Sequence, residues 1–378
     1  MEKYKYFATT SKGLEETLAG EVVALGGEEI SAVTGGVSFS GDADLGMQAN
    51  LWLRTANRVL RHLSDFDAPT PEALYEGVRA IRWTDLFDLK RTIAVDATVR
   101  ESGITHSHFA AQKCKDAVVD TFRDAVGFRP DVDRLNAQVR INLRIVRDEA
   151  VLSLDLSGES LNRRGYRTGP AFASLRETLA AGILLLAEYD GEQPLVDPAC
   201  GAGTFLIEAA LIASNTAPGL LRDDFGFKNL RDFEPKRWSR LVDAARAAVQ
   251  PRRIGPLSGF DISQTVLADA RANARNAGFA DKIAFAVRDV SALAPEGGPG
   301  LIVCNPPYGV RLTGGPGGIE PFYAGLGKAL KDNCGGWTAW ILSGNPEATR
   351  GLKLKTSRRI PLMNGPIDCR LLRYDLRP

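Results

Sequence analysis

An asparagine, two prolines and a tyrosine occupy positions 305–308, directly after the short apolar run Leu301–Cys304. The run is typical of a strand, and it must end there because the prolines fix φ and lack an N–H group. The Asn305 amide and the Pro306 backbone carbonyl can accept hydrogen bonds, and the Tyr308 ring offers a flat face to a base. This combination suits chemistry at the exocyclic amine of a planar base.

A second group of residues, Asp197–Thr204 (DPACGAGT), joins an apolar strand to a helix. Glycines let the backbone approach a ligand closely, and the N-terminus of the following helix favours a carboxylate. Such a turn is a weak signal alone, because dinucleotide enzymes place G-x-G-x-x-G there. Residues 197–204 lack the third glycine of that pattern, and Asp197-Pro198 precedes the first glycine. Asp261 ends the next strand, where a carboxylate can accept both hydroxyls of a ribose, and Asp289 ends the one after.

Metal and thiol chemistry are disfavoured by residue spacing. The five cysteines are scattered without a CxxC pair, so neither a zinc site nor a disulfide framework is expected. His106 and His108 have no carboxylate or cysteine at ligand spacing. Cys200, in the glycine loop, and Cys304, in an apolar strand, are expected to be small buried residues. We therefore predict no metal site and no cysteine nucleophile.

A basic and aromatic cluster lies in the polar segment 158–170, and its members are Arg163, Arg164, Tyr166 and Arg167. Such a cluster can bind phosphates and stack on a base, which predicts an RNA contact. A solvated linker whose arginines pair with carboxylates is an equally open interpretation. The net charge of +1 does not decide between them, because a local patch governs nucleic-acid binding.

The elements that position these residues can be predicted from hydrophobic periodicity. From Leu175 onward, strands at 195–197, 257–261, 283–287, 301–304 and 337–342 alternate with helices. Segments 358–364 and 368–375 flank Gly365-Pro366 and predict a terminal hairpin. The order indicates an α/β fold with a mostly parallel sheet. Ligands bind at the carboxyl ends of such strands, where Asp197, Asp261, Asp289 and Asn305 all lie.

The first 157 residues predict two α+β units. Residues 1–66 read as strand, helix, strand, strand, helix, strand, which is a ferredoxin-like order. Residues 67–157 contain a strand at 93–100, a helix at 109–126 and paired strands at 139–146 and 151–157. We expect a linker at 158–172, the α/β domain at 173–378, and an insertion at Asn215–Gly255 whose contacts the sequence does not indicate.

Composition is that of a globular protein, with 44% hydrophobic and 25% charged residues among 378. No apolar run is long enough to span a bilayer, and the N-terminal MEKYKYFATT lacks the apolar core of a signal peptide. We therefore expect a cytoplasmic, reduced protein without a membrane partner.

DPACGAGT and NPPY, in this order, closely resemble motif I and the target-binding motif of S-adenosylmethionine-dependent amino-methyltransferases. The resemblance implies the Rossmann-like class I methyltransferase fold with S-adenosyl-L-methionine as cofactor. Asn305 and the Pro306 carbonyl would accept the two amine hydrogens, and Tyr308 would stack on the base. The cofactor residues that it implies are Asp197, Pro198, Cys200, Gly201, Gly203, Thr204, Asp261, Ile262, Asp289, Val290 and Asn305.

Longer strings, such as LSLDLSGESLNRRGYR, LVDPACGAGTFLIEAALIA and NGPIDCRLLRYDL, are similar to the bacterial THUMP-containing 23S ribosomal RNA guanine-N2 methyltransferases. SHFAAQKCKDAVVDTFR, from Ser107, resembles the THUMP RNA-binding domain, which the resemblance places at 67–157. It implies a monomer that methylates guanine N2 in 23S rRNA. Some relatives carry a second domain that makes 7-methylguanine. Because this sequence ends at Pro378, only the N2 activity is expected.

Three alternatives remain open. One is a tRNA guanine-N2 methyltransferase of the same architecture, whose motifs are hard to distinguish from those of the rRNA enzymes. A DNA adenine-N6 methylase shares NPPY but does not normally carry a THUMP domain. A non-catalytic RNA-binding assembly factor is disfavoured because DPACGAGT and NPPY are complete.

Overall fold

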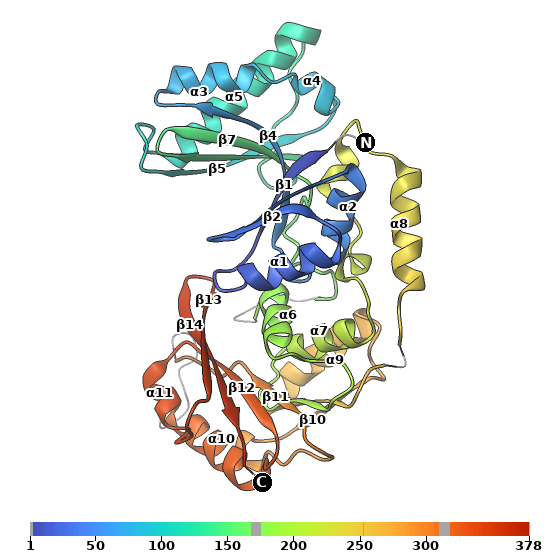
Figure 1. Cartoon of the computed structure of the whole chain (residues 1–378), viewed down its shortest axis with the longest axis vertical. Coiled ribbons are helices and arrows are strands. Elements are labelled where there is room, and N and C mark those ends of the chain that lie inside the picture. Colours follow the sequence, from blue (N-terminus) through green and yellow to red (C-terminus); the bar gives the residue numbers. More distant parts are fainter. Residues whose placement is uncertain (1–2, 168–174, 252, 310–317, 378) are drawn as a thin grey trace. The chain divides into compact units, whose positions relative to one another are not determined.

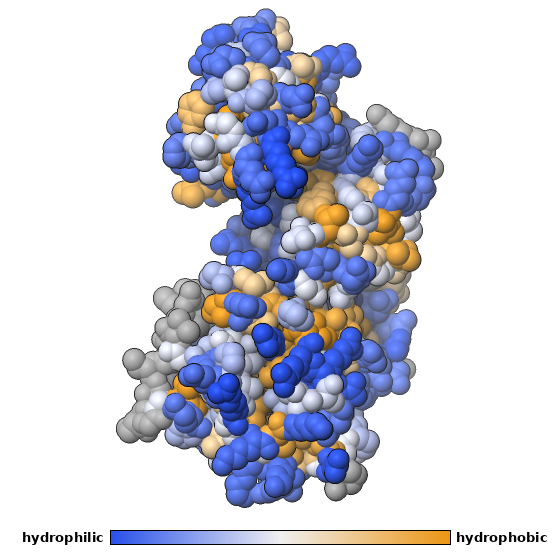
Figure 2. Space-filling model, turned by 60° about the vertical axis from the view of Figure 1, so that its left-hand side comes forward, coloured by the Kyte–Doolittle hydropathy of each residue, from blue (hydrophilic) through white to orange (hydrophobic). Residues whose placement is uncertain are grey.

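The computed structural model describes residues 3–167, 175–251, 253–309 and 318–377 (Figure 1). The chain forms two compact units, each built from separate stretches of sequence. The first unit is Met1–Thr9, Ala19–Leu161 and Asp223–Asp243, and the second is Thr10–Leu18, Asn162–Arg222 and Ala244–Pro378. Hydrophilic side chains cover most of the surface drawn in Figure 2, with apolar patches between them. Among the described residues, no helix is long and apolar enough to cross a membrane.

A seven-stranded sheet with the order β2-β3-β1-β4-β7-β6-β5 is the centre of the first unit. β4 pairs with β1 at its start and with β7 over most of its length, so the two predicted N-terminal units share one sheet. Only β5 and β6 run parallel. The strands are β1 (Tyr4–Thr9), β2 (Glu28–Val33), β3 (Gly36–Gly41), β4 (Arg58–Asp67), β5 (Ile93–Arg100), β6 (Val139–Val146) and β7 (Glu149–Asp155).

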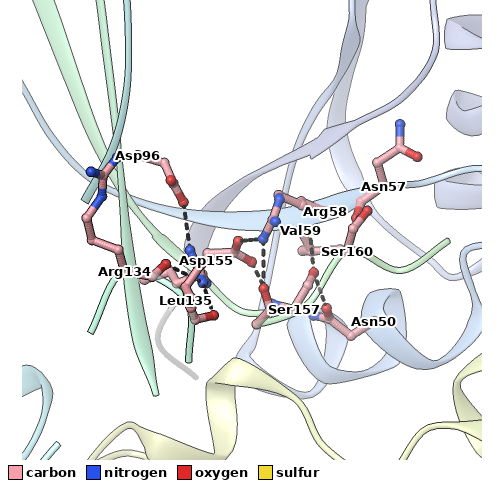
Figure 3. Close-up of polar contacts among 12 residues, drawn as sticks. Asn50, Asn57, Arg58, Val59, Asp96, Arg134, Leu135, Asp155, Ser157 and Ser160 are labelled. Atoms are coloured by element: carbon pink, nitrogen blue, oxygen red, sulfur yellow. Dashed lines mark hydrogen bonds and ion pairs between the residues drawn. The ribbon is translucent and has the colours of Figure 1, made fainter. Parts of the chain in front are cut away.

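A polar cluster lies where the two halves of this sheet meet (Figure 3). Arg58 on β4 forms an ion pair with the buried Asp155 on β7. The Ser157 hydroxyl accepts a hydrogen bond from the Val59 N–H (2.9 Å) and donates one to Asn50 Oδ1 (2.6 Å). These bonds satisfy polar groups that are buried at the join.

Helices cover parts of this sheet, and α3 and α5 lie side by side over β4, β5 and β7 (Figure 1). α3 begins after the N-cap Thr70, whose hydroxyl accepts from the Ala73 N–H, and α5 ends at Gly127 in the left-handed conformation. The helices of the first half are α1 (Glu15–Ala24), α2 (Ala43–Trp52), α3 (Pro71–Arg79), α4 (Trp83–Leu86) and α5 (Ser107–Val126).

Much of the predicted insertion belongs to the first unit. The Phe227 N–H donates to the Leu156 carbonyl (3.0 Å), and the Arg231 N–H donates to the Leu86 carbonyl (2.9 Å). Phe227 is buried and stacks on Phe225 with ring centroids 5.2 Å apart. This segment contains η2 (Gly226–Asn229) and most of α8 (Pro235–Ala247). Its aromatic residues therefore build a core.

The second unit contains a seven-stranded sheet with the order β10-β9-β8-β11-β12-β14-β13. The neighbouring strands β10, β9, β8, β11 and β12 pair in parallel, and β14 and β13 add an antiparallel hairpin. The predicted fold class is therefore confirmed. The strands are β8 (Leu195–Asp197), β9 (Leu257–Asp261), β10 (Ile283–Val287), β11 (Leu301–Cys304), β12 (Thr338–Ser343), β13 (Arg358–Asn364) and β14 (Ile367–Asp375).

Both faces of this sheet are covered. Leu301 and Val303 of β11 belong to one hydrophobic cluster, whereas Ile302 and Cys304 belong to another. That alternation explains why β11 is apolar without interruption. The main helices are α6 (Glu177–Leu186), α7 (Thr204–Ala213), α9 (Gln264–Asn276), α10 (Glu320–Asn333) and α11 (Pro346–Arg350), with short turns η1 (Pro218–Leu221) and η3 (Val290–Ala292).

Candidate active site at the carboxyl ends of the parallel strands

The loop after β8 contains the predicted cofactor glycines. Gly201 and Gly203 have φ values of +52° and +80°, a region that glycine adopts without strain. Gly203 is the N-cap of α7, so the N-terminus of that helix faces the loop. The Gly201 N–H donates to Asp261 Oδ2 (3.1 Å), and the Cys200 N–H donates to the Phe260 carbonyl (2.8 Å). These bonds join the loop to the carboxyl end of β9.

Asp197, the last residue of β8, is 2% exposed and accepts a hydrogen bond from the Ala199 N–H (3.2 Å). Burial raises the pKa of this carboxyl group to about 8, and the nearby Asp261 adds to the rise. Of the other predicted cofactor residues, Pro198, Cys200 and Thr204 are also buried. In this structure these residues shape the loop. Gly203 is buried as well, whereas Gly201 is partly exposed.

The two further predicted carboxylates end neighbouring strands. Asp261 is paired directly with Val287 of β10, and Asp289 follows two residues later. Asp289 is exposed and accepts from the Ser291 N–H (2.8 Å), and these Ser291 hydrogen bonds lower its pKa. Ile262, beside Asp261, is 72% exposed, while Val290 is buried. An exposed apolar side chain next to a carboxylate suits a nucleoside, which has a flat ring and a hydroxylated sugar.

Asn305 and Tyr308 contact each other directly. The Tyr308 hydroxyl donates to Asn305 Oδ1 (2.5 Å). The Tyr308 ring lies against Gly344, where an added Cβ would come within 2.8 Å of it. Burial raises the pKa of the Tyr308 hydroxyl far above its ordinary range, so it is a neutral donor. The Asn305 oxygen keeps a second lone pair that can accept an amine hydrogen.

Three residues that the sequence analysis missed support this motif. Tyr323 of α10 donates to the Pro307 carbonyl (3.2 Å), and Asn345 Nδ2 donates to the Tyr308 carbonyl (3.2 Å). Asn364 Nδ2 lies 3.4 Å from the Tyr308 hydroxyl. All three are distant from the motif in sequence. Tyr323 and Asn345 lie in none of the strings quoted above, and Asn364 begins NGPIDCRLLRYDL without any local sign of a contact with Tyr308. No local signal could have identified them.

The basic cluster requires a correction. Arg164 and Tyr166 are 2% and 1% exposed, and both reach Glu208 of α7, at 3.5 and 3.3 Å. Arg167 pairs with Glu177 (2.9 Å) and donates to the Thr204 hydroxyl (2.7 Å). These three side chains face the interior of the second unit, so they are not presented to RNA as predicted.

Arg164 and Arg167 do pair with carboxylates, but their side chains are only 2% and 14% exposed, so this part of the segment is not the solvated linker of the other interpretation. Arg163 is the one exposed member of the predicted cluster, and for it an RNA contact stays a prediction. Through Thr204, the first residue of α7, Arg167 instead supports the helix that follows the glycine loop.

Nucleophilic thiol chemistry finds little support in the described part of the chain. The five cysteines are buried, and burial raises the pKa values of Cys200 and Cys304 well above their ordinary range. A thiol that stays protonated is a poor nucleophile. Within residues 3–167, 175–251, 253–309 and 318–377, no three His, Cys, Asp or Glu side chains are grouped to hold a metal ion.

Family models match three consecutive parts of the chain. They are an RlmL ferredoxin-like domain at residues 5–60, a THUMP domain at 68–155 and an RMKL-like methyltransferase domain at 164–373. The last match covers more than half of the sequence.

Curated relatives align over almost the whole chain. The ribosomal RNA large subunit methyltransferase K/L of Syntrophotalea carbinolica is 42% identical over 98% of this chain and 53% of its own length. This chain therefore spans about half the length of that relative. The putative RNA methyltransferase slr0064 of Synechocystis sp. is 38% identical over 98% of this chain and 96% of its own length.

A solved structure has the same fold. SMU.472, a putative methyltransferase in complex with SAH, superposes with a TM-score of 0.89 at 28% identity, covering 100% of this chain and 99% of its own.

Proposed function

Because this chain belongs to the RMKL-like methyltransferase family, we propose that it transfers a methyl group from S-adenosyl-L-methionine to the N2 amine of a guanine in 23S rRNA. One observation carries the proposal. The glycine loop after β8 and the Asn305–Tyr308 motif after β11 lie at the carboxyl ends of strands that pair directly in one parallel sheet. A methyl donor and an amine acceptor bound at these two places would meet.

The residues around the glycine loop fit the cofactor. An added Cβ at Gly201 would meet no atom within 4 Å, so a ligand has room over the loop. The N–H groups at the start of α7 suit the carboxylate of a bound amino acid. Asp261 can accept the ribose hydroxyls, and the exposed Ile262 can contact the adenine ring. The cofactor supplies a sulfonium methyl that is already activated, so the protein has to bind and orient it.

Asn305 and the Pro306 carbonyl would act on the guanine amine. Accepting both hydrogens favours a pyramidal nitrogen whose lone pair points at the methyl group, and these bonds strengthen as positive charge develops on nitrogen. The Tyr308 hydroxyl fixes the orientation of the Asn305 amide, because it donates to the oxygen of that group. The flat face of Tyr308 would contact the base.

The N-terminal half of the chain would hold the RNA. We divide this half into a ferredoxin-like region at 1–66 and a THUMP domain at 67–157. The THUMP family match at 68–155 supports this assignment, and a linker at 158–172 and the catalytic domain at 173–378 complete it. We infer a cytoplasmic enzyme that acts as a monomer without a metal ion.

Methyl transfer from labelled S-adenosylmethionine tests the proposal. Unmodified large-subunit rRNA and unmodified tRNA are incubated separately with the protein, digested to nucleosides and analysed by mass spectrometry. N2-methylguanosine in rRNA, absent with the Asn305→Ala variant, is the expected result. The same product in tRNA alone would keep the chemistry and change the substrate. Methylated adenine, or no transfer to either RNA, would contradict the proposal.

A further inference from the structure

One face of the sheet in the first unit carries polar side chains in a regular pattern. On β6, Val139, Ile141, Leu143 and Ile145 are buried, whereas Arg144 between them is exposed. On β5, Asp96, Thr98 and Arg100 are exposed. The register places Thr98 opposite Arg144 and Arg100 opposite Val146, so these side chains share one face. α3 and α5 cover the other face (Figure 1).

Two arginines on the open face lack the ion pairs that two arginines on the helical side form. On the helical side, Arg79 pairs with Asp124 (2.8 Å) and Arg129 pairs with Asp120 (2.6 Å). On the open face, Arg100 and Arg144 have no carboxylate within ion-pair distance anywhere in the described chain.

The acidic groups of the open face are mostly occupied. Asp96 pairs with Arg140 (3.3 Å), Asp65 pairs with His62 (2.8 Å), and Asp155 pairs with Arg58. Glu149, exposed at the start of β7, and Asp67, exposed opposite it on β4, are the carboxylates on this face that form no ion pair with a described residue. These two carboxylates lie on β7 and β4, so on β5 and β6 unpaired positive charge remains at Arg100 and Arg144.

The open face ends in a hollow of about 340 Å³ that is lined by Ala94, Val95, Asp96, Arg134 and Leu135. Arg140 fixes one wall, because it donates to the backbone carbonyls of Arg134 (3.1 Å) and Leu135 (2.9 Å) and pairs with Asp96 (Figure 3). The Arg134 side chain is exposed and pairs with no described carboxylate. From Ala94 to Arg100, this face extends about 20 Å at ~3.3 Å per strand residue.

We propose that this face, defined by Arg100, Arg134 and Arg144, binds the phosphates of a base-paired segment of RNA. The inference rests on the proposed function, in which the substrate is RNA. The exposed side chains of β5 and β6 on this face are two arginines and a threonine, which contact phosphates and 2′-hydroxyls, and Asp96, which is paired with Arg140. They include no aromatic ring, on which the bases of a single strand would stack. The face therefore suits a duplex, which it would contact through phosphates and 2′-hydroxyls and not through the bases.

Binding of the full chain to two fluorescent RNAs, measured by anisotropy without cofactor, tests this proposal. One RNA is a fully paired hairpin, and the other is a polyuridine strand of equal length. The variant is Arg100→Ala with Arg144→Ala. The matched control is Arg79→Ala with Arg129→Ala, which removes the same charge from the helical side of the same unit.

For the hairpin, the sheet variant should bind at least tenfold more weakly, and its slope of log Kd against log salt should be shallower by about two units. The control variant should stay near the wild type, and Glu149→Gln should bind slightly more tightly. Equal losses in the two double variants would overturn the proposal, as would a loss confined to polyuridine. Arg100, Arg129 and Arg144 are exposed and Arg79 is half-buried, and equal melting temperatures would establish that both variants fold.

This experiment is independent of the proposed methyl transfer. If the sheet variant lost hairpin binding but the wild type methylated no guanine, the surface would stand and the proposed function would fail. If the wild type methylated guanine and the sheet variant bound the hairpin normally, the proposed function would stand and the surface would be rejected.

Discussion

At the scale of single residues, the hydrogen bond between Tyr308 and Asn305 determines how the amide faces its substrate. The hydroxyl donates to Asn305 Oδ1, which leaves the amide no freedom to exchange its oxygen and nitrogen positions without losing that bond. The sequence predicted the roles of both side chains toward a base. It could not predict their contact, because the turn that brings them together is fixed by Tyr323 and Asn345.

We expect Tyr308→Phe to lower kcat by roughly fivefold, the effect of losing a hydrogen bond of ~1 kcal/mol, without changing the Kd of S-adenosylmethionine. The ring is retained, so stacking on the base is retained too. Steady-state methyl transfer and calorimetry measure the two quantities. Tyr189→Phe is the control, because its hydroxyl is bonded to the Gly191 carbonyl instead. Unchanged kcat in Tyr308→Phe would reduce Tyr308 to a stacking residue.

The raised pKa of Asp197 predicts how stability depends on pH. The folded protein holds this proton up to about pH 8, whereas the unfolded chain releases it near pH 4. Between these values the folded state binds more protons than the unfolded state, so stability falls as pH rises. Melting curves without cofactor should show a smaller fall between pH 5 and 8 for Asp197→Asn than for the wild type. Parallel curves would mean that Asp197 is charged when folded.

At the scale of elements, α7 links the cofactor loop to the buried ion pairs of the second unit. Its first residue, Thr204, accepts a hydrogen bond from Arg167, and its Glu208 pairs with Arg164. The sequence identified α7 and its glycine loop from local pattern alone. It left the arginines between two interpretations, because the choice depends on Glu177 and Glu208, which are buried positions of α6 and α7.

Glu208→Ala should destabilise the protein by about 3–5 kcal/mol, because it leaves the charge of Arg164 buried without its partner. Glu192→Ala removes a carboxylate from an exposed pair with Arg253 and should cost less than ~1 kcal/mol. Urea unfolding of both variants makes the comparison. Similar costs for the two would indicate that water or a rearranged neighbour compensates Arg164.

At the scale of the whole molecule, the chain leaves the second unit after Arg222 and returns to it at Ala244. Periodicity and motif order predicted the parallel sheet, its hairpin and the place of the site, since these depend on neighbouring residues. They could not predict that residues 223–243 join the first unit. The partners of that segment, Leu86 and Leu156 among them, are far away in sequence and carry no matching pattern.

This division predicts that stability and cofactor binding can be changed separately. Phe227→Ala opens a cavity in the first unit and should cost about 3–5 kcal/mol, while the Kd of S-adenosylmethionine at the second unit stays unchanged. Asp261→Ala should do the reverse, raising that Kd with little effect on the melting temperature. Differential scanning calorimetry and titration calorimetry on both variants measure the two effects. A loss of cofactor affinity in Phe227→Ala would show that the packing of the inserted segment controls the site, because Phe227 belongs to the first unit and the glycine loop to the second.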